Sequence, residues 1–204
     1  DPSGSTQGAY GELGSWQDGA SEGRGGTYRV AQVVAGGEAR ATWTFTINQA
    51  RSLPVYAWFK AGSNRSSTAR YEVDHAAGTS VVVVSQKLDS ERWRYLGTFP
   101  FAPGMPAAVH LTNDGVEVGD YVVADSVRLG GGIGFVDYGA GPSGEPRWRQ
   151  SAKSHAAEEE IPFSVRSGRG DVGVRPSIAL WQGADIYFAL HTNAGGGRGT
   201  SSFV

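Results

Sequence analysis

Apolar and polar residues alternate along much of the chain between residues 28 and 129. The clearest case is residues 39–47, where apolar and polar side chains occupy opposite faces of an extended chain: Ala41, Trp43, Phe45 and Ile47 against Arg40, Thr42, Thr44 and Thr46. A period of two is typical of a β-strand that buries one face. The pattern therefore predicts a strand over Ala39–Ile47 with its apolar face in a core.

Similar segments recur along this region, separated by turn residues. We expect further strands at Tyr28–Val34, Leu53–Lys60, Ala69–His75, Ser80–Gln86, Arg92–Phe101, Ala107–Thr112 and Tyr121–Leu129. Tight turns are expected at Ala76-Ala77-Gly78 and at Asn113-Asp114-Gly115, because glycine and Asn-Asp-Gly sequences favour them. About eight strands at roughly ten-residue spacing predict a β-sandwich of the jelly-roll type.

The pattern differs at both ends of this region. Residues 1–27 are rich in Gly, Ser, Glu and Asp, and we expect an irregular segment that docks through Tyr10, Leu13 and Trp16. We place a lead-in at residues 1–13 and the sandwich at residues 14–130. The remainder, residues 131–204, is predicted to be a partial α/β segment.

This last segment shows helical rather than alternating periodicity. A glycine-rich link leads to an expected helix at Glu145–Glu160, and a polar loop leads to a second helix at Val174–Gln182. The continuous apolar run Ile186–Leu190 is typical of a strand buried on both faces, and another strand is expected at Thr200–Val204. The fold class is thus mainly β, with an incomplete α/β segment after the sandwich.

Composition narrows the function classes. Glycine accounts for 31 of the 204 residues, about twice the usual share, which suits a domain with many turns. The net charge of −2 disfavours a protein that tracks nucleic-acid phosphates. The absence of cysteine excludes disulfides and a cysteine nucleophile. No apolar run approaches about 18 residues, so we expect no membrane span.

The strongest candidate for chemistry is His191. It follows the predicted buried strand, at the edge of an α/β sheet where ligands and catalytic groups gather. Its imidazole could serve as a metal ligand or a general base, or it could simply bond a nearby backbone group. His155 and Glu159 form a weaker candidate, because this i,i+4 pair lacks a second histidine.

Aromatic side chains are numerous in the predicted sandwich. If exposed, they could stack on sugar rings; most of them alternate as core residues do, which favours burial. They are Trp43, Tyr56, Trp58, Phe59, Tyr71, Trp93, Tyr95, Phe99 and Tyr121.

Residues 166–204 resemble part of a catalytic domain. The segment from Gly183 to Leu190, followed by His191-Thr192-Asn193-Ala194 and then Gly199-Thr200, is similar to the strand and loop around the last zinc-binding histidine of zinc-dependent N-acetylmuramoyl-L-alanine amidases. Arg175 also falls where that family places an arginine. The resemblance implies that His191 is a zinc ligand, that Asn193 shapes the loop or supports the ligand, and that Arg175 pairs with an acidic group, for which Asp185 is the candidate.

Residues 14–130 resemble a second family, the golvesin-type C-terminal domain, a β-sandwich of bacterial surface and secreted proteins. Five strings carry the resemblance: Val55-Tyr56-Ala57-Trp58-Phe59, Ala61-Gly62-Ser63-Asn64-Arg65, Ala69-Arg70-Tyr71, Trp93-Arg94-Tyr95-Leu96-Gly97-Thr98-Phe99 and Val122-Val123-Ala124-Asp125-Ser126-Val127-Arg128. Some bacterial amidases carry such a domain as an insertion, and the order of the two segments here is what that arrangement implies.

Together the resemblances imply a segment of a secreted, periplasmic or cell-surface bacterial hydrolase. Zinc would activate water to cleave the amide between N-acetylmuramic acid and L-alanine in peptidoglycan. The family uses two His and one Glu as ligands and a further catalytic Glu, whereas this chain supplies only His191. We therefore expect this chain to need the remainder of the same protein for activity.

The alternative is a non-catalytic protein whose sandwich binds peptidoglycan or another cell-surface glycan, or acts as a structural spacer. In that case the amidase-like segment would be a remnant.

Overall fold

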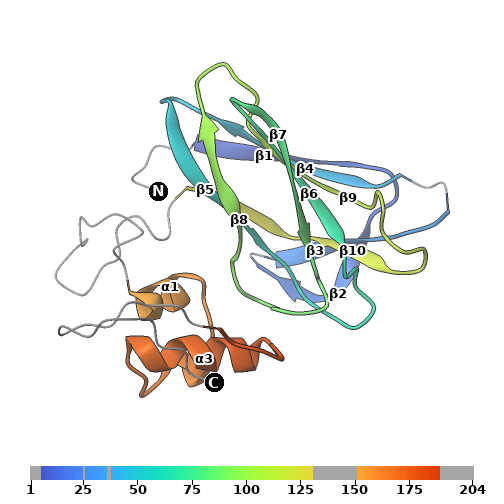
Figure 1. Cartoon of the computed structure of the whole chain (residues 1–204). Coiled ribbons are helices and arrows are strands. Elements are labelled where there is room, and N and C mark those ends of the chain that lie inside the picture. Colours follow the sequence, from blue (N-terminus) through green and yellow to red (C-terminus); the bar gives the residue numbers. More distant parts are fainter. Residues whose placement is uncertain (1–5, 25, 36–37, 131–150, 189–204) are drawn as a thin grey trace.

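The computed structural model describes residues 6–24, 26–35, 38–130 and 151–188. Eleven strands lie between Thr6 and Leu129, and three short helices follow between Ala152 and Trp181 (Figure 1). The strands are β1 Thr6–Leu13, β2 Gln17–Gly23, β3 Gly26–Gln32, β4 Arg40–Thr46, β5 Arg51–Trp58, β6 Ala69–His75, β7 Gly78–Val84, β8 Arg94–Phe101, β9 Ala108–Thr112, β10 Tyr121–Ala124 and β11 Ser126–Leu129. The helices are α1 Ala152–Glu158, α2 Phe163–Arg166 and α3 Asp171–Trp181.

The strands form three antiparallel sheets. One sheet has five strands in the order β1-β4-β9-β6-β7, and two smaller sheets have the orders β10-β3-β2 and β11-β5-β8. Only Asp125 separates β10 from β11, so one extended segment contributes to both smaller sheets. The mainly β fold predicted from the sequence is confirmed, and the arrangement is consistent with a β-sandwich.

One hydrophobic core joins the three sheets. It includes Val73 and Leu111 from the five-stranded sheet, Val123 from the sheet of β10, and Val55 from the sheet of β5, each essentially fully buried. The alternation of side chains along a strand explains which residues enter the core. Along β6, every second residue from Ala69 to His75 is buried, while the residues between them face outward. The core thus fixes which polar side chains line the outer face.

The irregular structure expected for residues 1–27 is wrong for the part of this range that the structure describes. Thr6–Leu13 is β1 and pairs with β4, and Gln17–Gly23 is β2 and pairs with β3. These strands are held by backbone pairing and a few anchors rather than by alternating apolar residues. Tyr10 packs on Trp43 with ring centroids 5.3 Å apart, and the Trp16 indole N–H donates to the Leu13 carbonyl.

The helices form a small core of their own. Ala156, Ile161 and Val174 are buried together, with Ile178 and Trp181 packed against them. The second helix expected from the sequence is confirmed: Val174, Ile178 and Trp181 share one face of α3, which ends at Trp181. Gly183 follows the helix with a φ of 70°, which suits glycine. Among the described residues, no helix is long and apolar enough to cross a membrane.

The predicted α/β segment does not form in the described residues. Ile186, Tyr187 and Phe188 belong to no strand, and the side chains of Ile186 and Phe188 are 85% and 71% exposed. A strand buried on both faces requires neighbouring strands, and every described strand belongs to the three sheets above. The rest of the predicted strand and the one at Thr200–Val204 lie outside the described residues.

Candidate functional site: a charged sheet face and its adjoining cavity

The outer face of the five-stranded sheet carries a row of charged side chains. On β6, Arg70, Glu72 and Asp74 alternate with buried residues and therefore all point outward. Strand β9 lies between β4 and β6, and its register sets His110 opposite both Thr42 and Glu72. The sheet thus gathers side chains from three strands that are distant in sequence.

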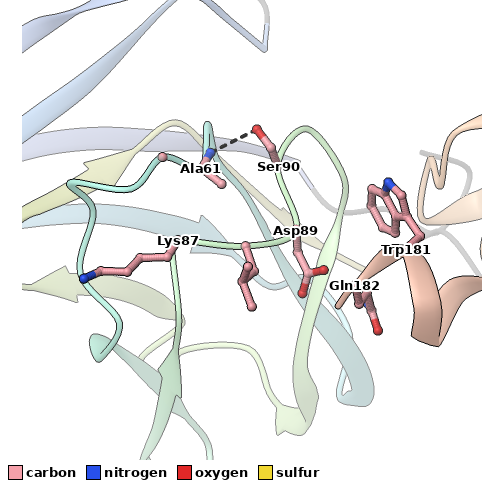
Figure 2. A pocket seen from close by; sticks show the side chains of 8 residues that line it. Ala61, Lys87, Asp89, Ser90, Trp181 and Gln182 are labelled. Carbon is pink, nitrogen blue, oxygen red and sulfur yellow. Dashed lines mark hydrogen bonds between the residues drawn. The ribbon is translucent and has the colours of Figure 1, made fainter. Parts of the chain in front are cut away.

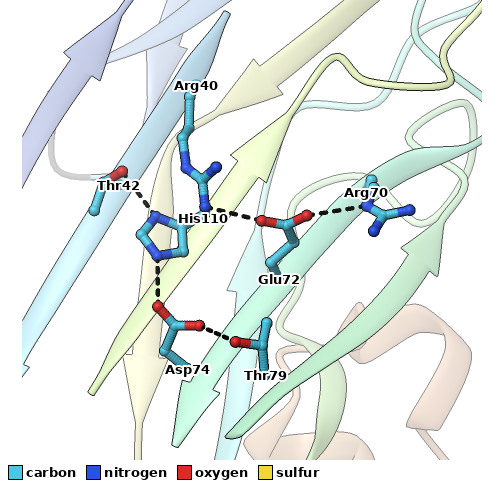
Figure 3. A network of polar contacts seen from close by, with 7 residues as sticks. All are labelled: Arg40, Thr42, Arg70, Glu72, Asp74, Thr79 and His110. Carbon is cyan, nitrogen blue, oxygen red and sulfur yellow. Dashed lines mark hydrogen bonds and ion pairs between the residues drawn. The ribbon is translucent and has the colours of Figure 1, made fainter. Parts of the chain in front are cut away.

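Glu72 is the centre of one half of this network (Figure 3). Its Oε2 accepts a hydrogen bond of 2.8 Å from Arg40 Nη2, and its Oε1 accepts one of 3.1 Å from Arg70 Nε. The Glu72 side chain is only 19% exposed, whereas the side chains of Arg40 and Arg70 are 33% and 38% exposed. Because both arginines hold the carboxylate, the spacing of the two positive charges along the face is fixed.

His110 joins a second set of polar groups beside it. Its Nδ1 lies 2.9 Å from Thr42 Oγ1, and its Nε2 lies 3.0 Å from Asp74 Oδ2 (Figure 3). The other Asp74 oxygen accepts a hydrogen bond of 2.6 Å from Thr79 Oγ1. Partial burial would raise the pKa of Asp74, but hydrogen bonds from Thr79 and His110 outweigh it and hold the pKa below its ordinary value.

The order hydroxyl, imidazole, carboxylate resembles that of a nucleophilic triad, but its setting does not suit catalysis. Such a triad needs backbone or side-chain donors where an oxyanion develops. Strand β4 pairs with β1 on one side and β9 on the other, so the backbone N–H groups around Thr42 are used in the sheet. We interpret Thr42, His110 and Asp74 as a support for the charged face.

A cavity of about 440 Å³ adjoins this network where β4 begins and β9 ends. Arg40 and Glu72 belong to both the network and the cavity. The remaining walls combine polar and apolar side chains, including Glu38, Thr112, Asp114, Val34 and Val118. The Thr112 hydroxyl is buried and has no hydrogen-bond partner within the described part of the chain.

Such a cavity suits a ligand with hydroxyl groups and apolar edges. The guanidinium and carboxylate groups can donate to and accept from hydroxyls, and the exposed valines Val34 and Val118 offer apolar contact. The partners already bonded to Arg40 and Glu72 orient these groups before a ligand arrives. The site therefore favours recognition of a polyhydroxylated molecule.

The aromatic side chains are not a second exposed platform. Trp43, Phe59 and Tyr71 are buried in the main core, and Tyr56, Trp58 and Trp93 are buried in a separate cluster, while Tyr95 is exposed. On the sheet of β5, the Arg128 guanidinium lies 4.4 Å from the Tyr56 ring centroid and 4.6 Å from that of Trp93. The helical segment also docks here, because Trp93 N donates to the Glu159 carbonyl and Arg92 pairs with the Glu159 side chain.

The residues named from the amidase resemblance are not brought together within the described structure. His191 and Asn193 lie outside the described residues. Arg175 pairs with Asp171, one helical turn earlier, at 2.7 Å, whereas Asp185 was the expected partner and is exposed. The zinc expectation depended on His191 and stays a prediction; the described residues contain no group of three or more His, Asp or Glu side chains placed to hold a metal.

Sequence reasoning did not select the charged face. No motif around Arg40, Glu72, Asp74 or His110 predicts a functional role for these residues. The available signal was the charged residue at every second position of β6 together with the polar face of β4. Their convergence depends on β9 lying between these strands, which local alternation does not reveal.

The fold and the site define an all-β domain with a polar face suited to ligand binding. The chain belongs to the golvesin C-terminal domain family, whose profile matches residues 3–131. The match confirms the resemblance to the golvesin-type C-terminal domain, and it begins at residue 3, before the expected start at residue 14. The match includes β1, consistent with its place in the five-stranded sheet.

Two relatives and one solved structure are similar to this chain over a small part of their own length. The chain is 35% identical over 96 residues to xanthan lyase of Bacillus sp. (strain GL1), covering 46% of this chain and 10% of the lyase. It is 35% identical over 89 residues to golvesin of Dictyostelium discoideum, covering 43% of this chain and 15% of that protein. The solved structure of Paenibacillus xanthan lyase matches with a TM-score of 0.54 and 27% identity, over 59% of this chain and 12% of that one.

These comparisons correct the amidase interpretation. The matching family is the golvesin C-terminal domain, no amidase family matches, and the relatives above are a lyase and golvesin. The identification of a zinc-dependent peptidoglycan amidase is therefore wrong, and the hydrolase activity that it implied is not supported. It depended on a short motif after a predicted strand, and the described half of that strand does not form.

Proposed function

We propose that the β-sandwich is a non-catalytic polysaccharide-binding domain. The charged face around Glu72 and the adjoining cavity form its binding surface. One observation carries the proposal: Arg40 and Glu72 are held rigidly by their partners and also line a cavity of about 440 Å³. The family membership and the relative named xanthan lyase support a carbohydrate-related role.

The charges on the face favour a neutral or weakly charged segment of polysaccharide. The two positive charges of Arg40 and Arg70 are balanced by Glu72 and Asp74 on the same face, while Glu38 and Asp114 add negative charge at the cavity. Strong attraction to a polyanion would need an excess of cations, which this face lacks. Hydrogen bonds to sugar hydroxyls would therefore provide the specificity.

A structural spacer is the second candidate, because each charged group of the network already has a protein partner. In either role, we propose a location outside the cytoplasm, at the surface or in the medium, where polysaccharides are accessible. The two roles differ in whether the face binds a polymer.

Sedimentation with insoluble or gel-forming polymers tests the proposal. The panel contains xanthan, peptidoglycan and cellulose, and the bound fraction of the chain is measured. We expect at least one polymer to retain the wild-type chain, and Arg40→Met to reduce retention strongly. Arg51→Met, an arginine at the start of β5 that bonds only Gln49 among the described side chains, is the matched control. Failure of every polymer to retain the wild-type chain would favour the spacer.

A further inference from the structure

A second cavity, which shares no lining residue with the first, lies between the sandwich and the helical segment. It measures about 360 Å³, within the range of pockets that hold small ligands. The loop between β7 and β8 supplies Leu88, Asp89 and Ser90, and the end of α3 supplies Trp181 and Gln182 (Figure 2). The family match ends at residue 131, so the end of α3 adds a wall, Trp181 and Gln182, that lies outside the golvesin domain, and the cavity stays open to solvent.

Asp89 is the polar centre of this cavity. Its Oδ2 accepts a hydrogen bond of 3.1 Å from Arg94 Nη1 and lies 2.7 Å from Arg92 Nη2. Its Oδ1 is buried without a hydrogen-bond partner among the residues described. Buried carboxylate oxygens are normally bonded, so this oxygen favours a donor that arrives with a ligand.

The loop is built to hold Asp89 in place. The backbone of Asp89 is left-handed, with a φ of 61°, and that of Glu91 has a φ of 60°. Ser90 Oγ accepts a hydrogen bond of 3.0 Å from the Ala61 backbone N–H, which ties the loop to the end of β5 (Figure 2). The Ser90 hydroxyl keeps its own hydrogen, which it can donate to a ligand.

The other side of the cavity is apolar. Leu88 is 55% exposed, and the half-buried indole of Trp181 stands opposite the loop (Figure 2). The Arg92 guanidinium lies 5.6 Å from the centroid of this ring, so a ligand would contact only the indole face turned away from Arg92. The face of an indole carries partial negative charge and attracts the weakly positive C–H edge of a ring. A flat molecule with one C–H face and hydroxyls around its rim fits this combination of Trp181, Asp89 and Gln182.

The charges exclude an anion as the preferred ligand. Arg92 and Arg94 are already directed at Asp89, and Arg92 also pairs with Glu159. Lys87 pairs with Asp120, and its side chain points away from Asp89 (Figure 2). Among the described residues of the cavity wall, Lys87 is the single cation, and it is paired and directed away from Asp89, which disfavours a sugar acid or phosphate.

We propose that this cavity binds a single neutral pyranose, presented by the end or a branch of a polysaccharide. Asp89 and Gln182 would bond its hydroxyls, and Trp181 would contact its C–H face. The proposal rests on the polysaccharide-binding function for the source of the sugar, but it does not depend on the charged face around Glu72.

Titrations followed by ¹H–¹⁵N NMR test it on the full chain. The probes are methyl β-D-glucopyranoside, methyl α-D-mannopyranoside, methyl β-D-galactopyranoside and glucuronate. We expect at least one neutral glycoside to shift the Trp181 indole and Gln182 amide signals saturably, and glucuronate to bind more weakly. Asp89→Asn should weaken binding about tenfold or more. Asparagine tolerates the left-handed backbone, so this variant keeps the loop conformation.

Gln182→Ala is the second variant, since it removes one polar contact at the helix end without touching the arginines. Asp185→Asn, at an exposed position of the same segment, is the matched control and should bind as wild type. The proposal is overturned if no neutral glycoside shifts these signals, or if Asp89→Asn and Gln182→Ala both bind normally. Asp185→Asn should likewise leave polymer retention intact. Saturable shifts of the Trp181 and Gln182 signals in a chain that no polymer retains would refute the charged face and not this cavity.

Discussion

Gln86 offers a quantitative test of how the sheets are joined and how the β7–β8 loop is positioned. Its side chain is fully buried just after β7. Its Nε2 donates to the Tyr71 hydroxyl at 3.0 Å and to the Val123 carbonyl at 2.8 Å, and its Oε1 accepts from the Val123 N–H at 2.8 Å. The Gln86 side-chain amide thus bonds both the N–H and the carbonyl of Val123 in β10, and also the Tyr71 hydroxyl in β6 of the five-stranded sheet.

Replacing Gln86 with leucine keeps the approximate volume but removes all three hydrogen bonds. Each buried polar group left without a partner costs about 1–3 kcal/mol. Two backbone groups of Val123 would be orphaned, and the Tyr71 hydroxyl would lose its donor. The better burial of leucine offsets a part of this. We therefore expect the free energy of unfolding to fall by about 3–5 kcal/mol.

Urea unfolding followed by tryptophan fluorescence measures this loss. Gln49→Leu is the matched control because Gln49 is exposed, and it should change the free energy of unfolding by less than about 0.5 kcal/mol. A loss below about 1 kcal/mol for Gln86→Leu would refute the reasoning, since the three hydrogen bonds would then contribute little. The backbone of Gln86 also bonds Ser66 and Gly62, so we expect faster amide exchange in residues 87–91 as well.

Three further predictions address the charged face, the first turn and the helical segment. The pKa of Asp74 in the folded state lies below its ordinary value of 3.8. As the pH falls, the unfolded state therefore takes up a proton at a higher pH than the folded state does. The free energy of unfolding thus decreases as the pH drops through 3.8 towards the folded pKa. Asp74→Asn should therefore reduce the slope of melting temperature against pH below about pH 4, and an unchanged slope would argue against the contacts of Thr79 and His110. Gly14→Ala should destabilise the chain by about 2–4 kcal/mol in urea unfolding, because its φ is 84° and a Cβ would lie 2.0 Å from the Glu38 carbonyl oxygen. Gly11→Ala has no neighbour within 4 Å and should be nearly neutral; equal effects of the two would contradict this account. Glu159→Ala should speed amide exchange in residues 152–181 relative to the sandwich, because it removes the contact with the buried Arg92, whereas Glu117→Ala should not.

Alternation predicted most of the sandwich because burial on one face imposes it. The strand at Ala69–His75 was placed with the observed bounds, and the strand at Ala39–Ile47 differs from β4 by one residue at each end. The predicted strand over Tyr121–Leu129 is divided at Asp125, where the chain passes from one small sheet to another. Both carboxylate oxygens of Asp125 accept a hydrogen bond from the Arg24 backbone N–H. Arg24 lies in a turn that is distant in sequence, so the local pattern around Asp125 could not predict this contact.

The first two strands were missed for a physical reason. β1 and β2 are largely exposed, and their Gly, Ser and Glu content is typical of loops. They are strands because β4 and β3 offer free edges for backbone pairing, which is a tertiary effect that overrides local propensity.

The candidate sites were harder to predict than the fold. The charged face requires three strands in the order β4-β9-β6, and the second cavity requires a loop near residue 89 to meet a helix near residue 181. Such long-range placements leave no local periodicity. In contrast, the short motif at His191 drew attention because it resembled a family, and the comparisons with known proteins assign the chain to a different one.

The central claim is that the face around Glu72 binds polysaccharide. Isothermal titration calorimetry of the wild-type chain and of Arg40→Met, with a soluble form of whichever polymer retains the chain, measures it most directly. The account predicts saturable binding by the wild type and by Arg51→Met, and a loss of about tenfold or more in affinity for Arg40→Met. Equal affinity of all three chains for the polymer would contradict it.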